Sequence, residues 1–136
     1  MKLKEQLWYL AHAYSGNIVQ NMASVNILAA KLFDLGVFFY SPLSMTHPIH
    51  TTRIDLPDYH GDGVDWEQWL QFDTVFMNKC DGLILCPGWT TSKGCRREKR
   101  VFEEAHKLVY TYNYFVIAFT NEQKVEYLYL QGEKTP

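Results

Sequence analysis

Glu98 is the residue whose position best suits nucleophilic chemistry. It lies three and four residues before Val101 and Phe102, so in a helix its carboxylate falls on or beside the apolar face. Burial is costly for a charge without a role. A place within about one turn of a helix start favours the ionised form, and an ionised, partly desolvated carboxylate can attack an electrophilic carbon. The alternative is a glutamate that only complements the helix N-terminus.

The stretch before this helix could hold an anion. Ser92 and Gly94 stand there in the sequence WTTSKGCRRE, and a serine hydroxyl beside free backbone N–H groups suits a phosphate. The alternative makes Ser92 a helix N-cap and Gly94 a turn residue. A capping box does not explain Glu98, because that motif would need a glutamate at the position of Cys95.

Two aspartates and a tyrosine could complete a site. Asp73 falls inside a predicted helix and Asp81 directly precedes the apolar run GLILC. Paired carboxylates can share proton transfer and the orientation of hydroxyl groups. Tyr9 alternates with Trp8 and Leu10 in the first predicted strand, so its phenol points to the other face and could reach a carboxylate. The alternatives are a solvated helical aspartate, a turn aspartate and a core tyrosine.

The elements that must position these residues alternate between strands and helices. Apolar runs predict strands at 7–11, 37–40, 82–86 and 114–119, with a further strand at 125–130. Helical spacing predicts helices over 18–35, over 65–80 and from 94 to 109. Such an alternation is typical of a parallel sheet covered on both faces. We therefore expect a single α/β domain over 1–136, a Rossmann-like or flavodoxin-like three-layer sandwich with about five strands.

Residues 41–64 show no sustained hydrophobic period, of either the helical or the strand kind. Residues 41–64 are predicted to form a long active-site loop, and residues 120–136 a C-terminal strand and tail. In open parallel sheets ligands bind beyond the carboxyl ends of the strands. This rule directs attention to 11–17, 41–48 and 87–98, which contain two aromatic residues, Tyr14 and Trp89, that could stack on a base.

Composition narrows the range of partners. The chain has 136 residues, 47% of them hydrophobic, and a net charge of −2, so it has material for one core but no overall attraction for a nucleic-acid polymer. Three cysteines without a CxxC pair suit reduced thiols in a cytoplasmic protein, and no apolar run is long enough for a membrane span. His47 and His50 lack the further ligands that structural zinc needs, so no metal or other cofactor is expected.

Five stretches of the chain form a recognisable series. They are YLAHAYS at 9–15, SPLSMTHPI at 41–49, the W-x-x-W-L-x-x-D pattern at 66–73, CDGLIL at 80–85 and GWTTSKGCRRE at 88–98. In this series the chain resembles the nucleoside 2-deoxyribosyltransferase superfamily. The likeness is greatest to its small phage and bacterial members and to deoxynucleoside 5′-monophosphate N-glycosidases. It covers residues 7 to about 119.

The resemblance implies a role for each matched residue. Glu98 would attack C1′, Tyr9 would orient it, Asp81 would contact the sugar or the nucleophile, and Asp73 would help to protonate the departing base. Ser92 and Gly94 would hold a 5′-phosphate. The other predicted substrate-binding residues are Tyr14, Ser15, Trp89 and His47, the last as part of a lid. The basic residues around Glu98, which are Arg96, Arg97, Lys99 and Arg100, are expected to form a solvated face.

The expected function is therefore cleavage of the N-glycosidic bond of a (deoxy)nucleoside or nucleoside 5′-monophosphate. It would proceed through a covalent glycosyl intermediate on Glu98, as in retaining glycosidases. The alternative is a module with the same pocket that binds or sequesters a nucleotide without chemistry. The resemblance also implies a homodimer or higher homo-oligomer, with the run VEYLYL at 125–130 as a contact surface.

Overall fold

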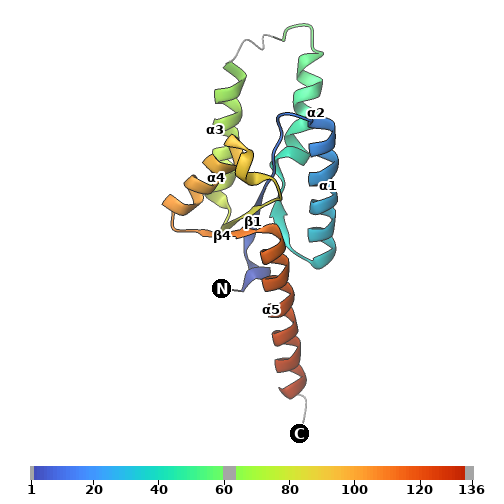
Figure 1. Ribbon diagram of the computed structural model, residues 1–136, viewed down its shortest axis with the longest axis vertical. Helices are drawn as coiled ribbons and strands as arrows, with labels where there is room; N and C mark the ends of the chain where they lie inside the picture. Colours follow the sequence, from blue (N-terminus) through green and yellow to red (C-terminus); the bar gives the residue numbers. More distant parts are fainter. Residues whose placement is uncertain (1, 60–63, 134–136) are drawn as a thin grey trace.

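The structure, a computed structural model, has a parallel sheet with helices on both faces (Figure 1). It describes residues 2–59 and 64–133. The described residues form a four-stranded sheet of order β2-β1-β3-β4, in which every neighbouring pair is parallel. This confirms the predicted Rossmann-like or flavodoxin-like α/β fold. The strands are β1 (Leu7–Ala11), β2 (Phe38–Tyr40), β3 (Gly82–Leu85) and β4 (Leu108–Thr111).

Long helices connect the strands and follow the last one. They are α1 (Ile18–Leu35), α2 (Pro42–Ile54), α3 (Val64–Lys79), α4 (Lys93–Glu104) and α5 (Tyr112–Glu133). Short 3₁₀ turns, η1 (Leu3–Glu5) and η2 (Trp89–Thr91), precede β1 and α4. The start of α1 is capped by Asn17, whose side chain accepts from the Gln20 N–H at 3.0 Å, and its end by Gly36 in the left-handed region at φ 88°.

Alternation along β1 divides the core into two layers. Trp8 and Leu10 face one side of the sheet, and Tyr9 and Ala11 face the other. On the first side they pack against buried residues of α1 and α5, and on the second against buried residues of α3 and α4. The molecule is therefore a sandwich of helices, sheet and helices, as Figure 1 shows, and Tyr9 belongs to the layer of α3 and α4.

The prediction for the C-terminal part was wrong. Residues 114–119 and 125–130 lie in α5, not in strands, and β4 is formed by residues 108–111, of which 108 and 109 were assigned to the end of the preceding helix. The helical period is present in the buried residues Tyr112, Phe115 and Phe119, but the aromatic and β-branched residues between them also favour strands. Residues 134–136 lie outside the described part.

The prediction of a loop across 41–64 was also wrong over most of its length. Pro42 stands in the first turn of α2, where its missing N–H costs nothing, and the helix continues to Ile54 with Pro48 inside it. Pro42 is the only residue of α2 that is fully buried. Because so little of the helix faces the core, its sequence has no regular apolar stripe from which a helix could be predicted. Residues 60–63 lie outside the described part.

The connections out of β1 and β3 run in opposite directions. The chain leaves β1 through α1 to the edge strand β2, and leaves β3 through α4 to the other edge strand β4. Ligands of open α/β sheets bind at such a switch point, beyond the carboxyl ends of the two strands. The predicted segments 11–17 and 87–98 follow these two ends. No helix among the described residues is long and apolar enough to cross a membrane.

Candidate functional site

Glu98 lies on the buried side of α4. Ser92 caps this helix, because its hydroxyl oxygen accepts a hydrogen bond from the Cys95 N–H at 3.2 Å. The helix then turns Cys95, Glu98 and Phe102 towards the sheet, and Glu98 is only 8% exposed. The predicted burial of this carboxyl group is confirmed. Burial raises its pKa to about 7, so the start of the helix does not keep it fully ionised at neutral pH, contrary to our expectation.

Tyr9 presents its hydroxyl to Glu98 from the centre of β1. Its ring is fully buried and lies 5.8 Å from the Phe102 ring of α4, centroid to centroid. The hydroxyl lowers the pKa of Glu98, although it meets no partner with full hydrogen-bond geometry among the described residues. Burial and the neighbouring Glu98 carboxyl raise the pKa of Tyr9 well above its ordinary value. The phenol therefore stays protonated and can donate to the carboxylate.

Asp73 completes a pair of carboxyl groups from α3. It is half-buried, its Oδ1 atom is buried without a hydrogen-bond partner among the described residues, and burial raises its pKa to about 6. Its charge also raises the pKa values of Glu98 and Tyr9. A pair in which the charge of one carboxyl group opposes the ionisation of the other is suited to acid and base roles.

Arg97 and Tyr40 belong to the same cluster, and the sequence analysis missed both. Arg97 was assigned to a solvated face, but it is half-buried, lies 5.5 Å from the Trp66 ring centroid and lowers the pKa values of Asp73 and Glu98. Its direct proximity in sequence to Glu98 was the available signal.

Tyr40 ends β2 and contributes an aromatic wall. Its ring stacks on Phe76 of α3 at 4.2 Å and lies 6.1 Å from the ring of Tyr9. Burial, with a contribution from the charge of Asp73, raises its pKa to about 12. The alternation of β2 beside β1 could have placed it on the face of Tyr9, because the two residues are register partners.

Asp81 lies away from this cluster. It precedes β3 at the amino end of the strand, where its carboxylate accepts from the Leu7 N–H at 2.8 Å and its own N–H donates to the Leu7 carbonyl at 2.8 Å. It is exposed. The structure therefore gives Asp81 a role in joining the starts of β1 and β3, and it does not bring this residue to Glu98.

The proposed anion-binding residues stand at the start of α4. Ser92 is the N-cap, and Gly94 follows with ordinary room around it, since an added Cβ would lie 3.9 Å from the Ser92 hydroxyl. The cap bond uses Ser92 as an acceptor, so its hydroxyl proton remains able to bind an anion. Trp89, in η2, packs against the core on the Glu98 side, with the Lys99 ammonium 5.8 Å from its ring centroid.

Tyr14 and His47 are brought together across the carboxyl edge of the sheet. The Tyr14 hydroxyl and His47 Nδ1 lie 2.8 Å apart, which joins the loop after β1 to α2. Asn21 holds that loop by donating to the carbonyls of Tyr14 and Ser15 at 3.0 and 3.1 Å, and the Ser15 side chain is exposed. The loop that follows β1 and the helix that follows β2 therefore meet, and both contain residues that the sequence analysis assigned to substrate binding.

Other features are separate from this cluster. Cys80, Cys86 and Cys95 are free and buried. No group of three or more potential metal ligands gathers within residues 2–59 and 64–133. A groove of about 630 Å³ lies between α1 and α5, on the other side of the sheet, and contains none of the predicted site residues.

A match to a protein-family model covers the part of the chain that contains the candidate site. A domain of unknown function, DUF1937, matches residues 6–114. The chain belongs to the DUF1937 family. The DUF1937 match runs from the start of β1 to the first turn of α5 and so includes every predicted site residue from Tyr9 to Glu98. No curated protein matches the sequence.

Proposed function

We propose that this DUF1937 protein cleaves the N-glycosidic bond of a (deoxy)nucleoside or nucleoside 5′-monophosphate, with Glu98 as the nucleophile. One observation carries the proposal: the Glu98 carboxyl is buried between Tyr9 and Asp73, and the pKa values of both carboxyl groups are raised, to about 7 and about 6. The motif resemblance to nucleoside 2-deoxyribosyltransferases supports the same assignment, and it gives the nucleoside as the substrate class.

The reaction would take two displacements at C1′. In the first, a Glu98 oxygen bonds to C1′ while the C1′–N bond breaks. The electron pair of that bond leaves with the base, which takes a proton from the Asp73 carboxylic acid. In the second, a water oxygen bonds to C1′, the glycosyl ester breaks and ionised Asp73 takes the water proton. A second base in place of water would give a transferred deoxyribosyl group.

These steps need Glu98 ionised and Asp73 protonated, whereas in the free protein the pKa of Glu98, about 7, is above that of Asp73, about 6. The bound substrate would therefore have to reverse this order. Arg97 favours the charged forms of both carboxyl groups, and the Tyr9 hydroxyl favours the Glu98 carboxylate. The positive charge that develops at C1′ would favour the Glu98 carboxylate further. Ser92, at the α4 N-terminus, would bind the 5′-phosphate where backbone N–H groups are free, and Tyr14, Ser15, Trp89 and His47 would surround the nucleoside.

A second function has an observation of its own. Asp81, which the resemblance assigned to the sugar or the nucleophile, is engaged at the opposite edge of the sheet. A protein that kept the pocket but lost this contact could bind a nucleotide without cleaving it.

One experiment separates the two functions. The full chain is incubated with each deoxynucleoside and its 5′-monophosphate, free base is measured by chromatography, and binding is measured by calorimetry on the same samples. We expect free base from at least one compound. Tight binding without base release after long incubation supports the binding module, and the absence of both contradicts both functions.

A further inference from the structure

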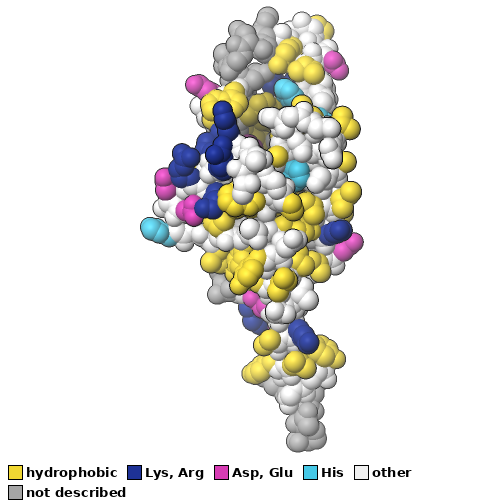
Figure 2. Space-filling model, in the orientation of Figure 1, with side chains coloured by type: hydrophobic (Ala, Val, Ile, Leu, Met, Phe, Trp, Pro, Cys, Tyr) yellow, Lys and Arg dark blue, Asp and Glu magenta, His cyan; other side chains and the backbone are white. Residues whose placement is uncertain are grey.

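The distal half of α5 carries apolar side chains that the rest of the described chain leaves uncovered. The helix has 22 residues, which corresponds to a length of about 33 Å. Its first turns are anchored by Tyr112, Phe115 and Phe119, and the remainder projects from the body (Figure 1). Figure 2 shows hydrophobic side chains on this projecting part. Such exposure of large apolar side chains marks an interaction surface.

Five residues of α5 form a single stripe. They are Tyr114, Ile117, Asn121, Val125 and Leu128, and we call them the α5 stripe. At about 100° per residue they fall within about 80° around the helix axis. The four apolar members are 64%, 58%, 67% and 58% exposed, in chain order. The stripe is therefore a narrow apolar seam of the kind by which two helices pair.

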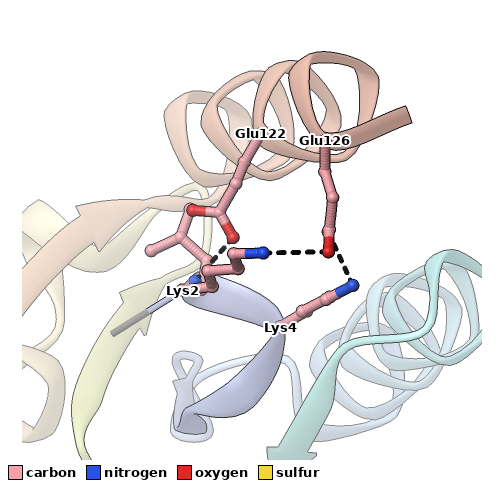
Figure 3. A network of polar contacts seen from close by, with 5 residues as sticks. Lys2, Lys4, Glu122 and Glu126 are labelled. Carbon is pink, nitrogen blue, oxygen red and sulfur yellow. Dashed lines mark hydrogen bonds and ion pairs between the residues drawn. The ribbon is translucent and has the colours of Figure 1, made fainter. Parts of the chain in front are cut away.

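The opposite flank of α5 is already occupied. Glu122 accepts from the Leu3 N–H at 2.8 Å, and Glu126 binds the ammonium groups of Lys2 and Lys4 at 2.9 and 2.6 Å (Figure 3). These contacts hold η1 against the helix. They leave the α5 stripe, which contains no charged residue, uncovered. Tyr127, Tyr129 and Leu130, on other sides of the distal helix, are exposed as well.

The spacing of the stripe is symmetric about Asn121. Ile117 and Val125 lie four residues before and after it, and Tyr114 and Leu128 lie seven residues before and after it. A two-fold axis relates a patch to itself, so residue i of one copy must meet residue j of the other, and j must meet i. This spacing meets that condition for two antiparallel copies of α5 centred at Asn121.

We propose that the α5 stripe binds the α5 stripe of a second copy of this chain in an antiparallel pair. Tyr114 then packs on Leu128 of the partner copy and Ile117 on its Val125. The two Asn121 side chains meet on the axis, where a polar residue fixes the register of an otherwise apolar seam. This proposal does not depend on the proposed enzymatic function.

The groove between α1 and α5 supports the same occupant. Ile117 belongs to the stripe and also lines this groove, together with Leu35 of α1 and Val116. In the antiparallel pair the projecting half of the partner's α5 passes beside it. Each copy therefore offers a projecting apolar half-helix and, along the other half, a mostly apolar groove that Lys31 and Asp34 also line, as a self-complementary surface requires.

The first test is the mass of the full chain in solution, measured by analytical ultracentrifugation over a range of concentrations. We expect a dimer, and at least a tenfold weaker association for Val125→Glu. The matched control is Val19→Glu on α1, since Val19 is 82% exposed but lies outside the stripe, and it should leave the dimer intact. Circular dichroism checks that both variants keep their helices. A monomer at all concentrations overturns the proposal, including a monomer that instead binds lipid vesicles.

The second test is disulfide formation between single cysteine variants. Antiparallel pairing places Tyr114→Cys beside Leu128→Cys of the other copy, so only the mixture of the two variants should give a cross-linked dimer under mild oxidation. A parallel pair would place Tyr114→Cys beside itself. Cross-linking of Tyr114→Cys alone therefore overturns the antiparallel arrangement.

Discussion

At the scale of single residues, the proposed chemistry depends on two carboxyl groups with raised pKa values. Glu98 and Asp73 come from different helices, and Glu98 is buried while Asp73 is half-buried. The Oδ1 atom of Asp73 has no hydrogen-bond partner among the described residues. A fold keeps such groups at a cost in stability, which is typical of functional sites.

That cost predicts a pH dependence of stability. The pKa of Glu98 is about 7 in the folded chain, against an ordinary value of 4.5. Between these values the folded state holds a proton that the unfolded state has lost, so stability should fall as pH rises, by about 3 kcal/mol from this group. Asp73 acts in the same direction. Urea unfolding at pH 4.5, 6 and 8 should therefore show a flatter dependence for Glu98→Gln than for the wild type.

The control for this measurement is Glu103→Gln. Glu103 is an exposed residue of the same helix, paired with Lys99 at 2.9 Å. Its replacement should leave the slope with pH unchanged. Equal slopes for the wild type and Glu98→Gln would show that Glu98 does not titrate as its burial indicates.

Arg97 should affect the pKa values of Asp73 and Glu98 more strongly than its basic neighbours do. Replacing it with glutamine removes a positive charge that favours the carboxylates of Asp73 and Glu98, so both pKa values should rise further. Carboxyl NMR titration measures this directly. Arg96→Gln is the matched control because Arg96 is exposed one position away. Equal shifts in the two variants would mean that Arg97 acts only through net charge.

These residues also show what the sequence could predict of the site. Helical spacing placed Glu98 on the buried face, and strand alternation placed Tyr9 on the sheet face opposite to Trp8 and Leu10, because both periods are local. Arg97 was missed because its contacts come from α3, which no local pattern reveals. Asp81 was expected near the nucleophile, but a residue that precedes a parallel strand lies at the amino edge, opposite to the ligand-binding edge.

At the scale of secondary-structure elements, the close contact between β1 and β3 depends on Gly82. A Cβ atom there would lie 2.3, 2.8 and 2.9 Å from three ring atoms of Trp8. Trp8 is fully buried and cannot move aside. Gly82→Ala should therefore destabilise the protein by about 1–3 kcal/mol or more, as measured by urea unfolding. Gly132→Ala, in an uncrowded turn of α5, should be neutral or slightly stabilising, and a similar loss in both variants would contradict this explanation.

The start of α4 links stability to the proposed anion site. Ser92→Ala removes the cap on the Cys95 N–H and should cost about 1 kcal/mol of stability. Ser92→Asp keeps a capping oxygen but places a negative charge where a phosphate would bind. If Ser92 binds the 5′-phosphate, Ser92→Asp should retain stability and raise KM for monophosphates more than for nucleosides. Equal effects on both substrate classes would assign Ser92 to capping alone.

The two helices that were mispredicted have different physical causes. In α5 the aromatic and β-branched residues favour strands locally, and packing of Tyr112, Phe115 and Phe119 on the sheet decides for a helix. In α2 little is buried, so no apolar stripe marks the helix. The helices α1 and α4 were predicted because each buries a regular stripe and has a capping residue, Asn17 or Ser92.

At the scale of the whole molecule, the two faces of the sheet have different roles. The face covered by α3 and α4 contains Glu98, Tyr9 and Asp73. The face covered by α1 and α5 contains the other core layer, the groove and the α5 stripe. A dimer through α5 would therefore leave the carboxyl cluster free, and Val125→Glu should dissociate the dimer without changing base release by more than about twofold.

The most direct test of the central claim compares base release by Glu98→Gln with that by Glu103→Gln, using the substrate that the wild type cleaves. Glutamine keeps the size of Glu98 and can neither attack C1′ nor carry the charge. We expect Glu98→Gln to lose at least 10³-fold in kcat while it still binds the substrate in calorimetry and unfolds cooperatively, and Glu103→Gln to match the wild type. Wild-type turnover in Glu98→Gln would contradict the account.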